Sequence, residues 1–179
     1  MRDYNVEVRF APYFLDPTTP PEGKPRRQMT APGDPPSHLE VRAQESGIAF
    51  TRGRTWTSNS HLALQAGEFA QDTGADLLRF HRAMFKAYFE DLEDVGKVDV
   101  VVRIGESAGL DGVALREALE SGEYREQVDD GIAWSRSVGV TAVPTFIFDE
   151  QTGFAGAQDY NVFESFMEKL GHKPKNDGA

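Results

Sequence analysis

No cysteine is present among the 179 residues of the chain. Disulfide bonds, thiolate metal sites and a cysteine nucleophile are therefore excluded within this sequence. No apolar run approaches the ~20 residues that a membrane-spanning helix needs. The opening residues, Met1-Arg2-Asp3-Tyr4-Asn5, do not form a signal peptide. These absences favour a protein with no membrane partner and a cytoplasmic location.

Positive charge is also scarce. The chain has 19 Lys and Arg residues against 29 Asp and Glu residues, which gives a formal net charge of −10. Because nucleic acids and anionic membranes are bound through clustered positive charge, we expect neither as a partner. Hydrophobic residues make up 39% of the chain and include 12 Phe, which is enough for a packed core and argues against disorder.

Motifs that hold metals or cofactors are missing as well. No two histidines are spaced to form a metal site on one helix, and no glycine-rich phosphate loop or GxSxG elbow occurs. We therefore expect no metal site, no cofactor and no catalytic residue within this chain. His61 and His81 fall on predicted amphipathic helices, and we interpret both as structural residues.

The first part of the chain predicts a strand, a long loop and a short helix. Val6–Phe10 alternates apolar and polar residues, as in a strand with one buried face. Residues 11–36 contain most of the prolines, which excludes a continuous helix or a central strand there. A helix is then expected over about Ser37–Ser46.

Residues 59–139 have helical periodicity throughout. We expect five helices, which begin near Asn59 or Ser60, Asp76, Asp99, Asp111 and Glu123. The second of them should bury one stripe at helical spacing, made of Leu77, Phe80, Met84, Phe85 and Tyr88. The five together predict a compact helical unit.

The pattern changes again after Pro144. A strand over Thr145–Phe148, a turn and a return strand over Phe154–Gly156 predict a hairpin. An amphipathic helix over about Tyr160–Leu170 follows. The predicted fold class is α/β, as a single domain over 1–179 with a helical insertion over about 37–139 and a hairpin and C-terminal helix over about 140–171.

Five separate motifs carry a resemblance to a known family. Gly139-Val140-Thr141-Ala142-Val143-Pro144-Thr145-Phe146 resembles the cis-proline signature of thioredoxin-fold proteins of the DsbA family. Four further segments resemble the FrnE-like branch of that family, in consistent order from about residue 4 to residue 171. They are residues 6–23, Asn59-Ser60, residues 84–96, and Phe154-Ala155-Gly156-Ala157-Gln158.

The resemblance implies a thioredoxin-like α/β fold with a helical insertion, in which the N-terminal βα unit is missing. Family members begin with a strand, a Cys-x-x-Cys motif and a first helix, and none of these occurs here. Since strands lie ~4.8 Å apart, loss of one strand would leave a slot of roughly 10 Å between Val6–Phe10 and Thr145–Phe148. Our hypothesis is that these residues belong to a longer protein.

The resemblance further implies a thiol–disulfide oxidoreductase, with this chain redox-inactive because it has no cysteine. Val143 and Pro144 would then face a substrate peptide, with Asn59 and Gln158 as further substrate-binding residues. Two alternatives stay open: a non-catalytic peptide-binding module, and a glutathione-linked isomerase or transferase in which Asn59 and Val143 contact the ligand. The expected partners are a protein or peptide thiol or disulfide, or glutathione, and a homodimer is an expected assembly.

Overall fold

Helices dominate the structure, a computed structural model that describes residues 3–26, 31 and 33–175. The helical elements are α1 (His38–Glu45), α2 (His61–Asp72), α3 (Leu77–Phe85), the π-helical turn η1 (Lys86–Glu90), α4 (Val98–Ala108), α5 (Gly112–Ser121), α6 (Arg125–Ser137) and α7 (Tyr160–Lys169). Two small antiparallel pairs complete the fold: β1 (Lys24–Pro25) with β2 (Trp56–Thr57), and β3 (Thr145–Phe148) with β4 (Thr152–Ala155).

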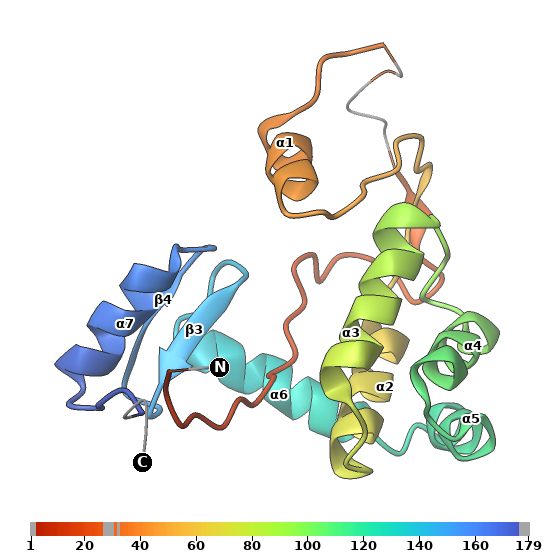
Figure 1. The fold of residues 1–179 in the computed structure, drawn as a ribbon. Coiled ribbons are helices and arrows are strands. Elements are labelled where there is room, and N and C mark those ends of the chain that lie inside the picture. Colours follow the sequence, from red (N-terminus) through yellow and green to blue (C-terminus); the bar gives the residue numbers. More distant parts are fainter. Residues whose placement is uncertain (1–2, 27–30, 32, 176–179) are drawn as a thin grey trace.

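The predicted helical unit is present as α2 to α6 (Figure 1). Two of its helices, α3 and α5, begin where an aspartate caps them: the Asp76 carboxylate accepts a hydrogen bond from the Arg79 amide, and Asp111 accepts from the amides of Val113 and Ala114. α4 begins two residues earlier than a cap at Asp99 would place it, because Lys97 is the capping residue. The core of the unit is formed by apolar side chains of α2 to α5, including Phe69, Phe80, Val101, Leu115 and Leu119, and by Tyr124 just before α6.

The stripe predicted for α3 is partly wrong. Phe80 and Met84 are buried, but Phe85 is 59% exposed. Phe85 lies one residue beyond Met84, about 100° around the helix, and so on a different face. The chain then widens into η1, in which Ala87, three residues after Met84, is buried in the core.

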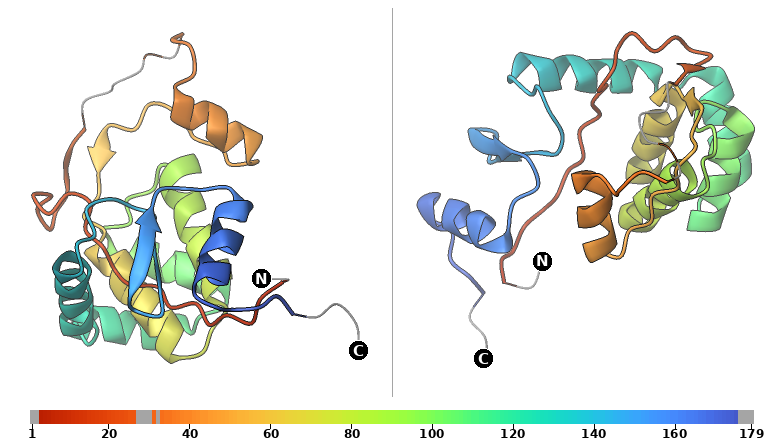
Figure 2. Two further views of the ribbon diagram at one scale, coloured as in Figure 1. Left: turned by 90° about the vertical axis from the view of Figure 1, so that its left-hand side faces the viewer. Right: turned by 90° about the horizontal axis from the view of Figure 1, so that it is seen from above.

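The hairpin and the last helix form a second packed unit. β3 and β4 pair in a register that joins Thr145 to Ala155 and Phe148 to Thr152, as the sequence predicts. One face of the hairpin packs against α7 through aromatic rings: the ring centroid of Phe146 lies 4.8 Å from that of Phe163, and that of Phe154 lies 4.9 Å from that of Phe166. Figure 2 shows α6 running from the helical unit to the hairpin.

The strand predicted over Val6–Phe10 is not formed. Within the described residues this segment makes no backbone hydrogen bond to another strand, although its alternation of apolar and polar residues suits one. The physical reason is that a strand exists only where a neighbour accepts and donates its backbone hydrogen bonds. Val8 and Phe10 are left exposed.

The chain just after this segment is fixed against α6. The buried Ser135 hydroxyl donates a hydrogen bond of 3.1 Å to the carbonyl of Pro12. The Pro12 ring lies so close to Gly131 that a Cβ atom there would come within 2.5 Å of it. The N-terminal segment therefore crosses α6 at a point where the helix has no side chain (Figure 1).

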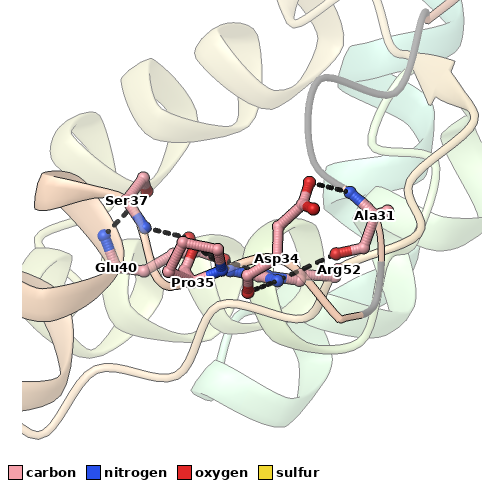
Figure 3. A network of polar contacts seen from close by, with 6 residues as sticks. All are labelled: Ala31, Asp34, Pro35, Ser37, Glu40 and Arg52. Atoms are coloured by element: carbon pink, nitrogen blue, oxygen red, sulfur yellow. Dashed lines mark hydrogen bonds and ion pairs between the residues drawn. The ribbon is translucent and has the colours of Figure 1, made fainter.

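α1 lies at the end of an excursion outside the helical unit (Figure 1). The helix expected over about Ser37–Ser46 is present, and Ser37 and Glu40 form a reciprocal capping box at its start. Arg52 closes the excursion: its guanidinium donates to both Glu40 carboxylate oxygens and to the carbonyls of Ala31, Asp34 and Pro35 (Figure 3). These hydrogen bonds occupy the whole guanidinium fork, so the network stabilises a loop that has few apolar contacts.

In the part of the chain that the structure describes, no helix has the length and apolar character needed to cross a membrane.

Candidate functional site

The loop at Val143 and Pro144 joins the end of α6 to β3. The peptide bond between these two residues is cis, and the Val143 side chain is 49% exposed. Two hydrogen bonds hold the loop: the Gly156 amide donates to the Pro144 carbonyl at 2.7 Å, and the Thr145 hydroxyl donates to the Ala142 carbonyl at 2.7 Å. The loop is therefore anchored to the hairpin, while the Val143 side chain stays open to solvent.

β3 has one free edge. Among the described residues its only strand neighbour is β4, so the backbone N–H and C=O groups on its other side have no strand to pair with. Such an edge is a template on which an extended peptide can add as a further strand. The free edge begins directly after the Val143–Pro144 loop.

A shallow pocket of about 310 Å³ lies on the face of the hairpin that points away from α7. Its apolar surface comes from Trp134 on α6, Val138 directly after α6 and Ile147 on β3, and all three are exposed. Gly153 lies opposite Ile147, where any side chain would come within 2.1 Å of the Phe146 carbonyl oxygen. The arrangement can accept the apolar side chain of an extended peptide.

The four residues predicted to bind substrate fall in two places. Val143, Pro144 and Gln158 lie together. The Gly156 amide donates to the Pro144 carbonyl, and Gln158, two residues after Gly156, donates through its side-chain amide to the Ala155 carbonyl at 3.3 Å. Asn59 lies in the helical unit instead. The structure therefore brings three of the predicted residues to one end of the hairpin and leaves the fourth at the start of α2.

Asn59 joins the proline-rich loop to α2. Its side-chain nitrogen donates to the carbonyls of Thr19 and Pro20 at 2.9 and 3.2 Å, and its side-chain oxygen accepts from the His61 amide at 2.9 Å. Both polar groups of the amide are thus used within the chain. The helix expected to begin near Asn59 or Ser60 begins at His61, with Ser60 as the capping residue.

Sequence analysis did not predict a chain of polar contacts in the helical unit, which joins Gln65, His61 and Asp129. His61 lies between two partners: its Nδ1 is 2.9 Å from Gln65 Nε2, and its Nε2 is 3.1 Å from an oxygen of Asp129. Since Gln65 Nε2 can only donate, His61 Nδ1 accepts, and Nε2 carries the proton that it donates to Asp129. His61 and Asp129 are 68 positions apart, so only the packing of α2 against α6 brings them together.

His81 is held in an apolar setting. Its ring centroid lies 4.7 Å from that of Phe10 and 5.7 Å from that of Phe80. Burial lowers the pKa of His81, because a charged imidazole is disfavoured away from water. These contacts give the side chain a packing role. Across the described ranges, no group of three His, Asp or Glu side chains is placed to hold a metal ion.

A comparison with known protein families assigns the chain to one of them. The family model for the DSBA-like thioredoxin domain matches residues 1–168. The chain belongs to this family. The predicted α/β fold of thioredoxin type is therefore confirmed, and the hairpin after Pro144 and the helical unit are parts of a DsbA-like architecture.

Known relatives agree with this assignment. The chain is 25% identical over 162 residues to the uncharacterized protein YwbO of Bacillus subtilis. The aligned residues cover 89% of this chain and 80% of that protein. It is 26% identical over 121 residues to the ClpXP adapter protein SpxH of Halalkalibacterium halodurans, over 64% of this chain and 39% of the adapter.

A solved structure shows the same fold. The crystal structure of a probable DsbA oxidoreductase from Streptomyces coelicolor superimposes with a TM-score of 0.66 at 22% sequence identity, over 79% of this chain. The chain spans 61% of that protein, which is less than two thirds of its length.

Proposed function

We propose that this chain is the substrate-binding part of a DsbA-like thiol–disulfide oxidoreductase, and that it holds an extended peptide along the free edge of β3. The observation that carries the proposal is that edge, which begins at the exposed Val143 and has beside it a pocket with exposed apolar side chains. Main-chain hydrogen bonds to β3 would supply affinity, and the pocket at Trp134 and Ile147 would select an apolar side chain.

The charge around the edge suggests which peptides bind. The pocket beside β3 is also lined by Glu150, which follows Asp149 in the exposed turn of the hairpin. The chain as a whole carries a formal net charge of −10. We therefore expect a peptide with an apolar residue next to a Lys or Arg, since opposite charge increases the rate of encounter and excludes acidic competitors.

The thiol chemistry itself needs cysteine from outside these 179 residues. In thiol–disulfide exchange a thiolate attacks one sulfur of a disulfide and the other sulfur leaves as a thiolate. No residue of this sequence can supply the attacking sulfur. The proposal is that the attacking sulfur comes from residues outside this sequence, while the peptide pairs with the free edge of β3. The chain alone should therefore not reduce insulin.

Peptide binding can be tested with the chain as it is. The probe is an acetylated six-residue peptide that alternates valine with threonine and ends in lysine. We expect saturable shifts of the amide signals of Val143, Thr145 and Ile147, and quenching of Trp134 fluorescence in a Trp56→Phe background. Shifts confined to other elements, or no saturable shift at all, would contradict the proposal.

A pair of charge substitutions provides the control. Val143→Asp places a carboxylate beside the free edge and should weaken binding of the peptide by about tenfold or more, as an unpaired charge at an interface does. Val113→Asp makes the same change on α5, where the side chain is 71% exposed and far from β3 in the sequence. Equal affinities for the two variants would refute the role of Val143.

A second candidate function is a non-catalytic adapter that binds a protein partner. The similarity to a ClpXP adapter protein favours it, together with the absence of cysteine from this sequence. In that case the same edge would hold a partner segment whether or not the partner carries a thiol. The two candidates differ in the thiol content of the native protein.

Glutathione as a ligand has less support, because the Asn59 amide that would contact it already donates to Thr19 and Pro20. The homodimer, the FrnE-like branch and the cytoplasmic location stay predictions.

A further inference from the structure

A continuous row of aromatic rings runs along α3 and η1. The ring centroid of Phe85 lies 6.2 Å from those of His81 and Phe89. Phe10 extends the row beyond His81, at a centroid distance of 4.7 Å, and Phe50 extends it beyond Phe89, at 4.9 Å. Two loops that are far apart in the sequence therefore add their rings to those of one helix. We call these five rings the α3 surface.

The exposed side of α3 faces away from the helices that hold it. α3 packs against α2 and α4, and Phe80 and Met84 are buried (Figure 1). Phe85 follows Phe80 by five residues, which places it about 140° around the helix, and it is 59% exposed. Leu78, seven residues before Phe85 and so on the same side, is 58% exposed. Large apolar side chains gathered on an exposed face mark a docking surface.

The α3 surface is positively charged, although the chain has a formal net charge of −10. Arg82 is exposed on the same side of α3, four residues after Leu78 and three before Phe85. At the other end of the row, the guanidinium carbon of Arg54 lies 5.9 Å from the centroid of Phe89. Neither arginine forms an ion pair with a carboxylate that the structure describes. The charge of this face is therefore complementary to an acidic partner.

The backbone of α3 indicates the form of that partner. The N–H and C=O groups of a helix are bonded within it, so an extended segment laid on α3 would leave its own backbone groups unpaired. A partner helix satisfies its own backbone and packs on α3 through side chains alone. At ~1.5 Å per residue, the stretch from Leu78 to Phe89 is roughly 16 Å long, which about three turns of a helix would cover.

We propose that the α3 surface binds an amphipathic helix of another protein, with acidic residues beside its apolar stripe. The apolar stripe would pack on Leu78 and Phe85, and a carboxylate would pair with Arg82. A second copy of this chain fits less well, because two α3 helices related by a twofold axis at Arg82 would oppose two arginines. None of these residues lines the pocket beside β3, so this surface is separate from the peptide site proposed there.

A matched pair of peptides tests shape and charge together. The probe is a fourteen-residue helical peptide with three leucines at helical spacing and a glutamate on either side of them, and its control has lysine in place of glutamate. We expect the probe to shift the amide signals of Arg82, Phe85 and Phe89 saturably, and the control to bind about tenfold more weakly or worse. Salt should narrow the difference. Equal affinities, or shifts that omit these residues, would overturn the proposal.

Substitutions at exposed positions assign the residues. Leu78→Ser should weaken binding of the probe by about tenfold, whereas Leu15→Ser, the same change at a side chain that is 72% exposed in the proline-rich loop, should leave it unchanged. Arg82→Gln should reduce the preference for the glutamate peptide, and Arg136→Gln on α6 should retain it. Equal effects within either matched pair would refute the assignment.

A photo-cross-linker identifies what covers the surface in the native protein. With p-benzoylphenylalanine in place of Phe85, we expect a link to a helix of another protein that has Asp or Glu within one turn of the linked residue. A link to a second copy, to the same polypeptide or to a segment without such a helix would overturn the proposal, as would the absence of any link.

Discussion

Gly131 offers a sharp test of how the N-terminal segment is held. In the middle of a helix, Gly→Ala normally stabilises a protein by about 1 kcal/mol. At Gly131, however, the new Cβ would lie 2.5 Å from Pro12 Cγ and 2.7 Å from Pro12 Cδ. Carbon atoms in favourable contact are roughly 3.5–4.0 Å apart, so the segment would have to move away by about 1 Å.

That displacement sets the size of the effect. Overpacking of this kind costs about 1–3 kcal/mol, and loss of the Ser135–Pro12 hydrogen bond would account for about 1 kcal/mol of it. Against the helical gain, we expect Gly131→Ala to lie between neutral and about 2 kcal/mol destabilising. Gly67→Ala on α2 is the matched control, because its Cβ would have neighbours no closer than 3.9 Å. That variant should gain the full helical stabilisation.

Urea unfolding followed by far-ultraviolet circular dichroism measures both variants. A double variant provides the internal check: Pro12→Ala removes the ring atoms that clash, so the pair Pro12→Ala and Gly131→Ala should couple favourably. If Gly131→Ala stabilises the chain as much as Gly67→Ala does, the segment does not pack on α6 as described and the reasoning fails.

Two further predictions follow from the polar contacts. Asn59→Ala removes the hydrogen bonds to Thr19, Pro20 and His61 and should destabilise the chain by about 1–3 kcal/mol in urea unfolding. The control is Asn161→Ala, at an exposed position on α7, which should change the free energy of unfolding by less than about 0.5 kcal/mol. Equal losses of stability in the two variants would argue against the role of Asn59. The hydrogen bonds from Arg52 lower the pKa of Glu40 to about 2, from an ordinary 4.5. Because the folded-state pKa is lowered, this contribution is present above pH 4.5 and is lost as the pH falls towards 2, so amide exchange in α1 should accelerate across that window. Glu40→Gln should remove this pH dependence, and a dependence that persists in the variant would refute the assignment.

Local signals predicted most of the secondary structure. Asp76 and Asp111 cap their helices as predicted, and the apolar run after Pro144 forms the hairpin. These features depend on neighbours within a few residues, which a sequence displays directly.

Features that depend on distant partners were not predictable in this way. Val6–Phe10 has the pattern of a strand, but a strand also needs a partner, and the pattern does not reveal whether one is present. His61 gives no sign of its bond to Asp129, because the two residues meet only through packing of α2 on α6. The site at Val143 and Pro144 was found through family resemblance, and its free edge became visible only in the structure.

The most direct test of the proposed function is the intact mass of the native protein from its own source, with a thiol count after reduction. We expect a polypeptide heavier than the 19.8 kDa of this chain, with two or more thiols. A native mass of 19.8 kDa with no thiol would contradict the oxidoreductase proposal and would favour the adapter.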